Sequence, residues 1–314
     1  MRRREFIKNS AILGGALAFG GVNFGSNLLF ANDLKVANMV PSITMNNGVK
    51  IPIIGLGVWK ISDLKECQRC VEDAFEIGYR LIDTAQAYGN EEAVGAAFRA
   101  SSLKRDEVFI ETKISPSNIS EKGVLQSFEE SMKRFKLDFV DLFLLHTPQG
   151  DAKGAWKALS KLYKEGRVRS IGVSNFYGNI LRQIATGKFG DVVPALNQIE
   201  THPYLQHFKV QDELKNYGIA MQAWSQFGNG VNGVLSEPSL AKIGEKYGKT
   251  AAQVILRWLI QRNVIVIPKT TRKARMIENF SVFDFELSKA DFDEIAKLEK
   301  NQRIWGGSWG REDI

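Results

Sequence analysis

The sequence predicts an α/β domain in which eight strand–helix units close into a (β/α)8 barrel of the TIM type. Short apolar strands alternate with amphipathic helices over roughly 235 residues, and the strands have the composition of strands buried on both faces. Eight units in that length favour a closed barrel over an open doubly wound sheet. No proline- or serine-rich linker interrupts the alternation, so residues 32–314 are predicted to form a single domain.

The predicted domain begins with a β-hairpin, which we expect to cover the bottom of the barrel. Residues 42–45 and 49–53 read as its strands, and the turn signal Asn46-Asn47-Gly48 lies between them. The barrel strands are predicted at residues 53–56, 81–83, 108–112, 139–145, 168–173, 195–199, 219–224 and 264–267. The helices are predicted at residues 63–77, 91–99, 121–135, 154–164, from 178, and at 209–216, 239–247, 251–259 and 273–279.

The first 31 residues read as an export signal rather than as part of the fold. Arg3-Arg4-Glu5-Phe6-Ile7-Lys8 has the twin-arginine arrangement, and the apolar run 11–22 is too short and too rich in glycine to predict a membrane span. The segment resembles a bacterial twin-arginine signal, which implies the translocation machinery as a partner and a periplasmic location. The alternative is a basic N-terminal arm followed by a buried helix.

The charge of the chain argues against a nucleic-acid partner. The formal net charge is +7, but four positive charges before residue 32, offset only by Glu5, belong to the predicted signal. The remaining chain carries +4, which is a charge typical of soluble proteins rather than a nucleic-acid-binding surface.

The two cysteines form a Cys-x-x-Cys pair, Cys67 and Cys70, within a predicted helix. The apolar positions Leu64, Val71 and Ala74 share their helical face, so both thiols are predicted to point into the core. A redox pair would need its first thiol at a helix N-terminus, and Cys67 lies more than one turn inside the helix. Core packing is therefore favoured over redox chemistry.

Polar or aromatic residues end seven of the eight predicted strands. In a barrel of parallel strands these ends meet on one face, so we expect the side chains to converge on one pocket. The residues, in chain order, are Asp83, Lys113, His146, Ser174 with Asn175, Gln198, Trp224 with Ser225, and Lys269.

Three of these residues make chemical sense together with Tyr88, which follows Asp83 in a short turn. An unperturbed tyrosine has a pKa of about 10, too high for efficient acid–base work at neutral pH. An adjacent Lys113 would lower that pKa, Asp83 would hold the lysine charged, and His146 would orient a carbonyl oxygen. The set could protonate a carbonyl oxygen while a cofactor delivers hydride to the carbon.

With these groups the sequence resembles the aldo-keto reductase family over essentially all of residues 43–298. The resemblance implies that Asp83, Tyr88, Lys113 and His146 are the catalytic tetrad, with Tyr88 as the general acid in carbonyl reduction. The motifs that carry it are Gly55–Trp59, Gly78–Ala85, Tyr88–Gly95, Thr112–Lys113, Asp141–His146, Ile171–Phe176, Asn197–Glu200, His202–Tyr204 and Ile267–Thr270.

The same resemblance implies a nicotinamide cofactor in the pocket. Ser174, Asn175 and Gln198 would hydrogen-bond the nicotinamide carboxamide, and Trp224 would stack on its ring. Ser225 would begin the loop that closes over the pyrophosphate.

The residues of the last strand–helix unit are predicted to determine whether the protein binds NADPH or NADH. By the resemblance, Lys269, Thr270 and Arg275 hold an adenosine 2′-phosphate, and Glu278 and Asn279 hold the adenine. A cationic pair with a hydroxyl suits a phosphate better than a free ribose hydroxyl, so NADPH is predicted in preference to NADH.

Two other motifs are interpreted without a functional role. Residues 228–233 fit Gly-x-Gly-x-x-Gly, but a dinucleotide fingerprint would open directly into a helix, whereas here the predicted helix begins only at Ser239. His202 and His207 are predicted to be structural or exposed, so no metal site is expected.

Two classes of function remain open from the sequence. The first is an NADPH-dependent reductase of a small aldehyde or ketone, with Trp59 and His146 lining the substrate pocket. The second is a cofactor-binding redox sensor or scaffold on the same barrel, since a fold does not fix a function. An intact tetrad favours the enzyme, because a sensor could lose it.

Overall fold

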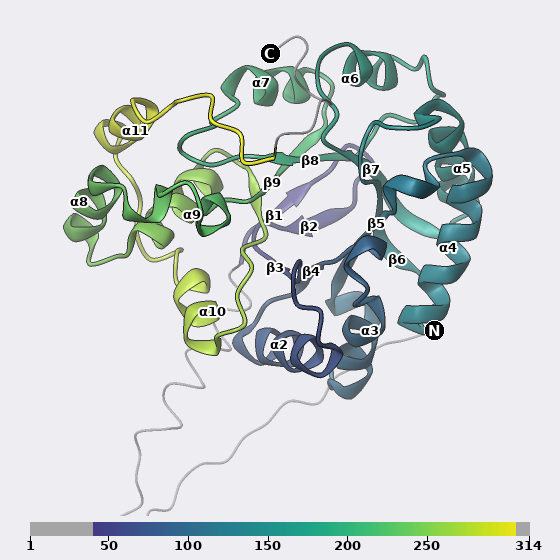
Figure 1. Ribbon diagram of the computed structural model, residues 1–314, viewed down its shortest axis with the longest axis horizontal. Helices are drawn as coiled ribbons and strands as arrows, with labels where there is room; N and C mark the ends of the chain where they lie inside the picture. Colours follow the sequence, from purple (N-terminus) through teal and green to yellow (C-terminus); the bar gives the residue numbers. More distant parts are fainter. Residues whose placement is uncertain (1–39, 306–314) are drawn as a thin grey trace, which may run out of the picture.

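The strands of the barrel are parallel and follow the order of the sequence around one sheet, as Figure 1 shows. The computed structural model describes residues 40–305. The strands are β3 (Leu56–Gly57), β4 (Leu81–Asp83), β5 (Phe109–Ile114), β6 (Val140–Leu145), β7 (Val168–Ser174), β8 (Leu196–Glu200), β9 (Ala220–Trp224) and β10 (Ile265–Val266). All except β9 are buried at every position or at all but one, as expected for a sheet covered by helices.

The two outer strands of this sheet meet and close the barrel. Ile54, just before β3, forms a parallel bridge with Val266 of β10. The amide of Gly55 donates to the Val266 carbonyl at 2.8 Å, and the Val266 amide donates to the Ile53 carbonyl at 2.9 Å. The predicted (β/α)8 barrel is therefore confirmed.

Helices surround the barrel and pack their apolar stripes against it (Figure 1). Several are started by side chains that accept from free backbone amides, among them Asp63 before the helix at Leu64–Ile77 and Thr250, within a capping box, before the helix at Ala251–Gln261. The helices are α2 (Leu64–Ile77), α3 (Glu91–Ala100), α4 (Glu121–Phe135), α5 (Ala152–Lys164), α6 (Gly178–Ala185), α7 (Phe208–Asn216), α8 (Pro238–Tyr247), α9 (Ala251–Gln261), α10 (Lys273–Phe280) and α11 (Lys289–Ala296). Short 3-10 turns are η1 (Gln86–Tyr88), η2 (Arg105–Glu107), η3 (Pro116–Asn118), η4 (Gly228–Gly230) and η5 (Val234–Ser236).

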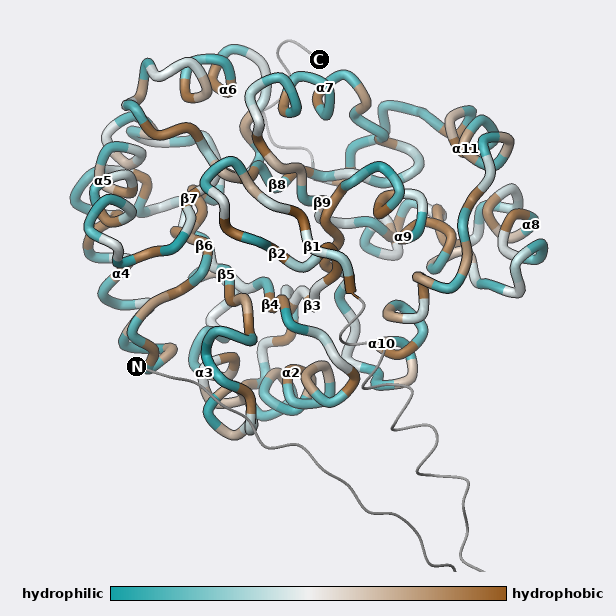
Figure 2. Tube along the Cα trace, turned by 180° about the vertical axis from the view of Figure 1, so that it is seen from behind, coloured by the Kyte–Doolittle hydropathy of each residue, from teal (hydrophilic) through white to brown (hydrophobic). Residues whose placement is uncertain are grey.

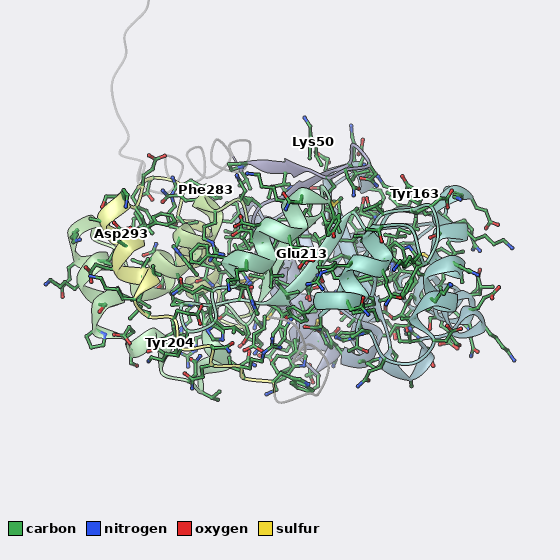
Figure 3. All side chains as sticks on the ribbon, turned by 90° about the horizontal axis from the view of Figure 1, so that it is seen from above. Lys50, Tyr163, Tyr204, Glu213, Phe283 and Asp293 are labelled. Atoms are coloured by element: carbon green, nitrogen blue, oxygen red, sulfur yellow. The ribbon has the colours of Figure 1, made fainter. Side chains whose placement is uncertain are left out.

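The N-terminal hairpin, β1 (Ser42–Thr44) and β2 (Lys50–Pro52), covers the end of the barrel at which the strands begin. Its turn residue Asn46 donates to the carbonyl of Pro194 at 2.9 Å, just before β8, and Met45 and Ile51 close the apolar interior. Figure 2 shows the hairpin lying across the barrel strands. In Figure 3, Lys50 of the hairpin and Tyr204, beyond the end of β8, lie at opposite ends of the barrel.

The structure also corrects and completes the sequence interpretation. The helix α11 is absent from the predicted elements, although Ser288 and Asp291 form a capping box at its start. Cys67 and Cys70 are both fully buried on α2, which confirms their prediction as core residues. Within residues 40–305 no helix is both long enough and apolar enough to span a membrane. The predicted export signal lies outside the described residues.

Candidate active site

The interior of the barrel changes from apolar to polar along the strands. Side chains alternate between the two faces of a strand, so Leu81 and Asp83 of β4 point inward, as do Phe109, Glu111 and Lys113 of β5. The leucine and phenylalanine pack in the apolar cluster that the hairpin covers. The charged side chains therefore lie at the end where the strands finish.

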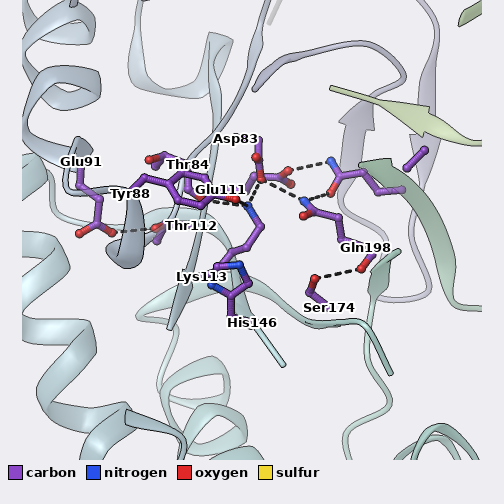
Figure 4. A network of polar contacts seen from close by, with 12 residues as sticks. Asp83, Thr84, Tyr88, Glu91, Glu111, Thr112, Lys113, His146, Ser174 and Gln198 are labelled. Carbon is purple, nitrogen blue, oxygen red and sulfur yellow. Dashed lines mark hydrogen bonds and ion pairs between the residues drawn. The ribbon is translucent and has the colours of Figure 1, made fainter. Parts of the chain in front are cut away.

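Four of the predicted residues meet at this end of the barrel (Figure 4). The Nζ atom of Lys113 is ion-paired with Oδ2 of Asp83 and donates to the carbonyl of Thr84 at 2.9 Å and to the Tyr88 hydroxyl at 3.4 Å. The ring of His146 lies edge-on to the ring of Tyr88, with centroids 6.0 Å apart and an interplanar angle of 77°. The geometry thus joins a phenol, an ammonium, a carboxylate and an imidazole.

The local structure explains how Tyr88 reaches this position. After β4 the chain turns through η1, and Gly89 follows with a φ of 70°, a conformation that glycine adopts readily. Asn90 is fully buried and its amide donates to the carbonyls of Val58 and Ile61 at 2.9 and 3.0 Å. The turn is therefore fixed against the loop that follows β3.

Burial and charge act in opposite directions on Lys113 and Tyr88. Burial lowers the pKa of Lys113, but the charges of Asp83, Tyr88 and Glu111 outweigh it and hold that pKa above its ordinary value. Burial raises the pKa of Tyr88, and Lys113 offsets only part of that increase. The sequence-based expectation of a lowered tyrosine pKa is wrong, because desolvation of the phenolate dominates.

His146 is neutral in this environment. Burial and the nearby charge of Lys113 lower the pKa of His146 to about 3. Its buried Nδ1 atom has no hydrogen-bond partner among the described residues. An imidazole with a free ring nitrogen beside Tyr88 can orient a polar atom of a bound ligand.

The residues predicted to hold the nicotinamide are linked to the same cluster. Gln198 donates from Nε2 to Oδ2 of Asp83 at 3.0 Å, and Ser174 donates to the Gln198 carbonyl at 2.9 Å. Asn175 donates to the carbonyl of His146 at 3.2 Å and accepts from the indole Nε1 of Trp224 at 3.0 Å. The ends of four neighbouring strands are thus connected by hydrogen bonds.

The predicted phosphate-binding residues form a separate group after β10 and on α10. Lys269 and Arg275 are exposed, whereas Thr270 is buried and its hydroxyl accepts from the Arg272 amide at 3.2 Å. Arg69 of α2 fixes this loop by donating to the carbonyl of residue 271 at 3.0 Å. Two exposed cations with a hydroxyl form a donor set that fits a phosphate group.

The other predicted ligand contacts lie around these two groups. Glu278 accepts from the hydroxyl of Thr250 at 2.6 Å, and Asn279 is buried beside it on α10. The Ser225 hydroxyl donates to the Asn229 side chain at 2.7 Å, in the loop after β9. The half-buried Trp59 follows β3, with its ring 4.4 Å from the ammonium of the next residue.

Two polar residues inside the barrel were missed by the sequence reasoning. Gln222 lies two positions before Trp224, and Glu111 lies two positions before Lys113. The Nε2 atom of Gln222 donates to Oε1 of Glu111 at 2.7 Å, and both residues are fully buried. Period-two alternation could have found them, because it places them on the inward face that carries the strand-end residues.

The fold is a closed parallel barrel, and an acid–base cluster lies at the ends of its strands, where enzymes with this fold have their active sites. The fold and the site together therefore indicate the class of barrel enzymes. The sequence profile of the Aldo/keto reductase family matches residues 53–300. The chain therefore belongs to the aldo/keto reductase family, whose members are oxidoreductases.

Similar proteins cover almost the whole of the described chain. Glyoxal reductase of Bacillus subtilis (strain 168) is 42% identical over 264 residues, which cover 84% of this chain and 94% of that protein. Methylglyoxal reductase DkgA of Salmonella typhimurium (strain LT2) is 40% identical over 267 residues, covering 83% and 94%. The crystal structure of an aldo/keto reductase from Brucella melitensis has a TM-score of 0.78 at 42% identity, covering 83% of this chain and 100% of that one.

Proposed function

We propose that the protein reduces a small aldehyde or ketone to an alcohol with NADPH, and that Tyr88 donates the proton. The observation that carries this proposal is the position of Lys113, whose ammonium contacts both the Asp83 carboxylate and the Tyr88 hydroxyl inside the barrel. Family membership supports the reaction class, and the exposed cations after β10 support the phosphorylated cofactor.

Bound NADPH would supply the hydride for the carbonyl carbon, and the residues of the site handle the proton. The neutral His146 orients the carbonyl oxygen, which brings that oxygen next to the Tyr88 hydroxyl. The phenol transfers its proton to the oxygen as negative charge develops there. Lys113 then stabilises the phenolate by charge, and Asp83 holds the ammonium in position. The product alcohol keeps one hydrogen from the cofactor and one from tyrosine.

The substrate class follows from the relatives. Two of the similar proteins are named for the reduction of glyoxal and methylglyoxal, which are small dicarbonyl compounds. We infer that small reactive aldehydes of this kind are substrates of this chain as well. Larger carbonyl compounds belong in the same assay, because the loops that set the size of the pocket differ among family members.

The test is turnover by the purified protein. NADPH absorbance should decline with glyoxal, methylglyoxal or another aldehyde, and the decline should be slower with NADH. Arg275→Ala should raise the KM for NADPH about tenfold or more and leave the KM for NADH nearly unchanged, because only NADPH carries the 2′-phosphate. NADPH binding without turnover of any carbonyl would favour the sensor, and equal use of both cofactors would contradict the proposed phosphate site.

Export by the twin-arginine route is the second part of the proposal. The intact Arg3-Arg4 pair, followed by Phe6, Ile7 and Lys8, supports it. We infer that the protein folds around its cofactor before transport, since NADPH is scarce outside the cytoplasm. Replacing both arginines by lysine should leave the protein in the cytoplasm of a bacterial host. Export of that variant, or an exported wild-type protein without nucleotide, would contradict this part.

A further inference from the structure

A second carboxyl group lies directly behind the acid–base cluster. Glu111 of β5 is fully buried, and its backbone is paired in register with Asp83 of β4. The side chains of the two residues lie within hydrogen-bonding reach of each other, and Figure 4 shows them next to the Lys113 ammonium. Among the described residues Lys113 is ion-paired with Asp83 alone, and Glu111 adds a second carboxyl group within the electrostatic reach of the same ammonium.

The hydrogen bonds around these carboxyl groups leave one fully buried oxygen without a donor. Gln198 donates from Nε2 both to Asp83 Oδ2 at 3.0 Å and to Gln222 Oε1 at 2.7 Å. Gln222 in turn donates to Glu111 Oε1 at 2.7 Å. The Oε2 atom of Glu111 is buried and has no partner among the described residues.

A proton on Glu111 would give its Oε2 atom a hydrogen-bond partner and remove the repulsion between the two carboxyl groups. An ionised carboxylate only accepts hydrogen bonds, so two ionised groups at this distance would repel each other and leave Oε2 unsatisfied. A protonated Glu111 can donate from Oε2 to the Asp83 carboxylate, which already accepts from Lys113. Burial and the negative charge of Asp83 raise the pKa of Glu111 well above its ordinary value, in agreement with this geometry.

We propose that Glu111 is a positioning residue for Tyr88. Glu111 acts as a neutral carboxylic acid that is hydrogen-bonded to Asp83, and its ionisation stops proton donation by Tyr88. The proposal rests on the function proposed above. The groups that face Glu111 are Asp83 on β4, Lys113 on β5, Gln222 on β9 and the hydroxyl of Tyr88, the last residue of η1.

The effect on Tyr88 follows from the charges in the cluster. With Glu111 neutral, Lys113 is shared only by the Asp83 carboxylate and the developing phenolate. An ionised Glu111 competes for the same ammonium and raises the pKa of Tyr88 further, so the phenol becomes a weaker acid. Burial also raises the pKa of Tyr88, and we expect ionisation of Glu111 to lower the reductase rate at alkaline pH.

Infrared spectroscopy tests the protonation state without any assay of activity. At neutral pH the wild type should show the carbonyl stretch of a protonated carboxyl group, and Glu111→Gln should lack it. Glu91→Gln is the matched control, because Glu91 is equally buried but accepts from Arg134 at 2.6 Å. Its spectrum should keep the band. Isotope labelling of glutamate in the wild type identifies the same band should the variant fail to fold, and absence of the band overturns the proposal.

The pH profile of turnover tests the role in catalysis. Glutamine is neutral at every pH and can still donate to Asp83, so Glu111→Gln should keep kcat within about threefold at neutral pH. The alkaline decline of kcat in the wild type should move to higher pH in this variant. An unchanged alkaline decline, or loss of most activity at neutral pH in a folded variant, overturns the proposal. A protein with the infrared band but no turnover would contradict the proposed function and leave the protonated Glu111 established.

Discussion

Replacing Lys113 by methionine removes the only cation that contacts the Asp83 carboxylate within residues 40–305. The side chain is fully buried, and its ammonium contacts Asp83, the Thr84 carbonyl and the Tyr88 hydroxyl. Methionine fills similar space but leaves Asp83 in the barrel with Gln198 as its remaining donor. Stranding one partner of a buried ion pair costs about 3–5 kcal/mol of unfolding free energy. For a domain of this size that is a fall in Tm of about 6–10 °C.

Thermal and urea denaturation of the purified variant measure this loss. The stranded carboxylate can take up a proton, so the difference from wild type should shrink as the pH is lowered toward about 4. The double variant Asp83→Asn/Lys113→Met has no stranded charge and should recover part of the stability lost in Lys113→Met. A loss below about 1 kcal/mol, or a double variant whose loss is the sum of the two single losses, would refute the reasoning.

Three further predictions concern groups elsewhere in the barrel. The pKa of His146 is lowered from 6.5 to about 3, so the unfolded chain binds a proton at pH values where the folded protein does not, and stability falls as pH drops through this window. The free energy of unfolding of the wild type should fall between pH 7 and 5, and His146→Gln should make this fall smaller by up to about 2 kcal/mol, measured by urea denaturation. The same pH dependence in both proteins would contradict the prediction. Burial raises the pKa of Cys67 to about 12, so this thiol should react with a thiol reagent only after denaturation, and rapid labelling of the native protein would contradict its burial. Gly95→Ala would place a Cβ atom 2.1 Å from the Phe135 carbonyl oxygen and should cost about 1–3 kcal/mol in the same denaturation assay, whereas wild-type stability would show that α3 moves away freely.

The barrel and the main site were predictable because both depend on local patterns. Short apolar strands alternating with helices predict a parallel sheet, and a parallel sheet brings the strand ends together. Asp83, Lys113 and His146 each follow an apolar run directly, so their convergence needed no knowledge of side-chain packing. Tyr88 could be added because it follows Asp83 by five residues.

Other features depend on contacts that the sequence does not display. The α11 helix has weak amphipathic character, and Asp291 at its start is satisfied by Lys246 and Tyr247 of α8. The direction of the pKa shift of Tyr88 depends on how far packing removes water from the phenol. Glu111 was not predicted as a site residue because it lies two positions before the strand-end residue Lys113, and the prediction considered only the residues at the strand ends.

Replacing Tyr88 by phenylalanine removes only the hydroxyl group that is proposed to donate the proton. The measurement is kcat for reduction of an aldehyde with NADPH, beside the Kd for NADPH and the Tm of both proteins. We expect kcat to fall by a factor of about 10²–10⁴, with the Kd and Tm close to those of the wild type. A folded, NADPH-binding Tyr88→Phe variant that keeps the wild-type kcat would contradict the assignment of Tyr88 as the proton donor.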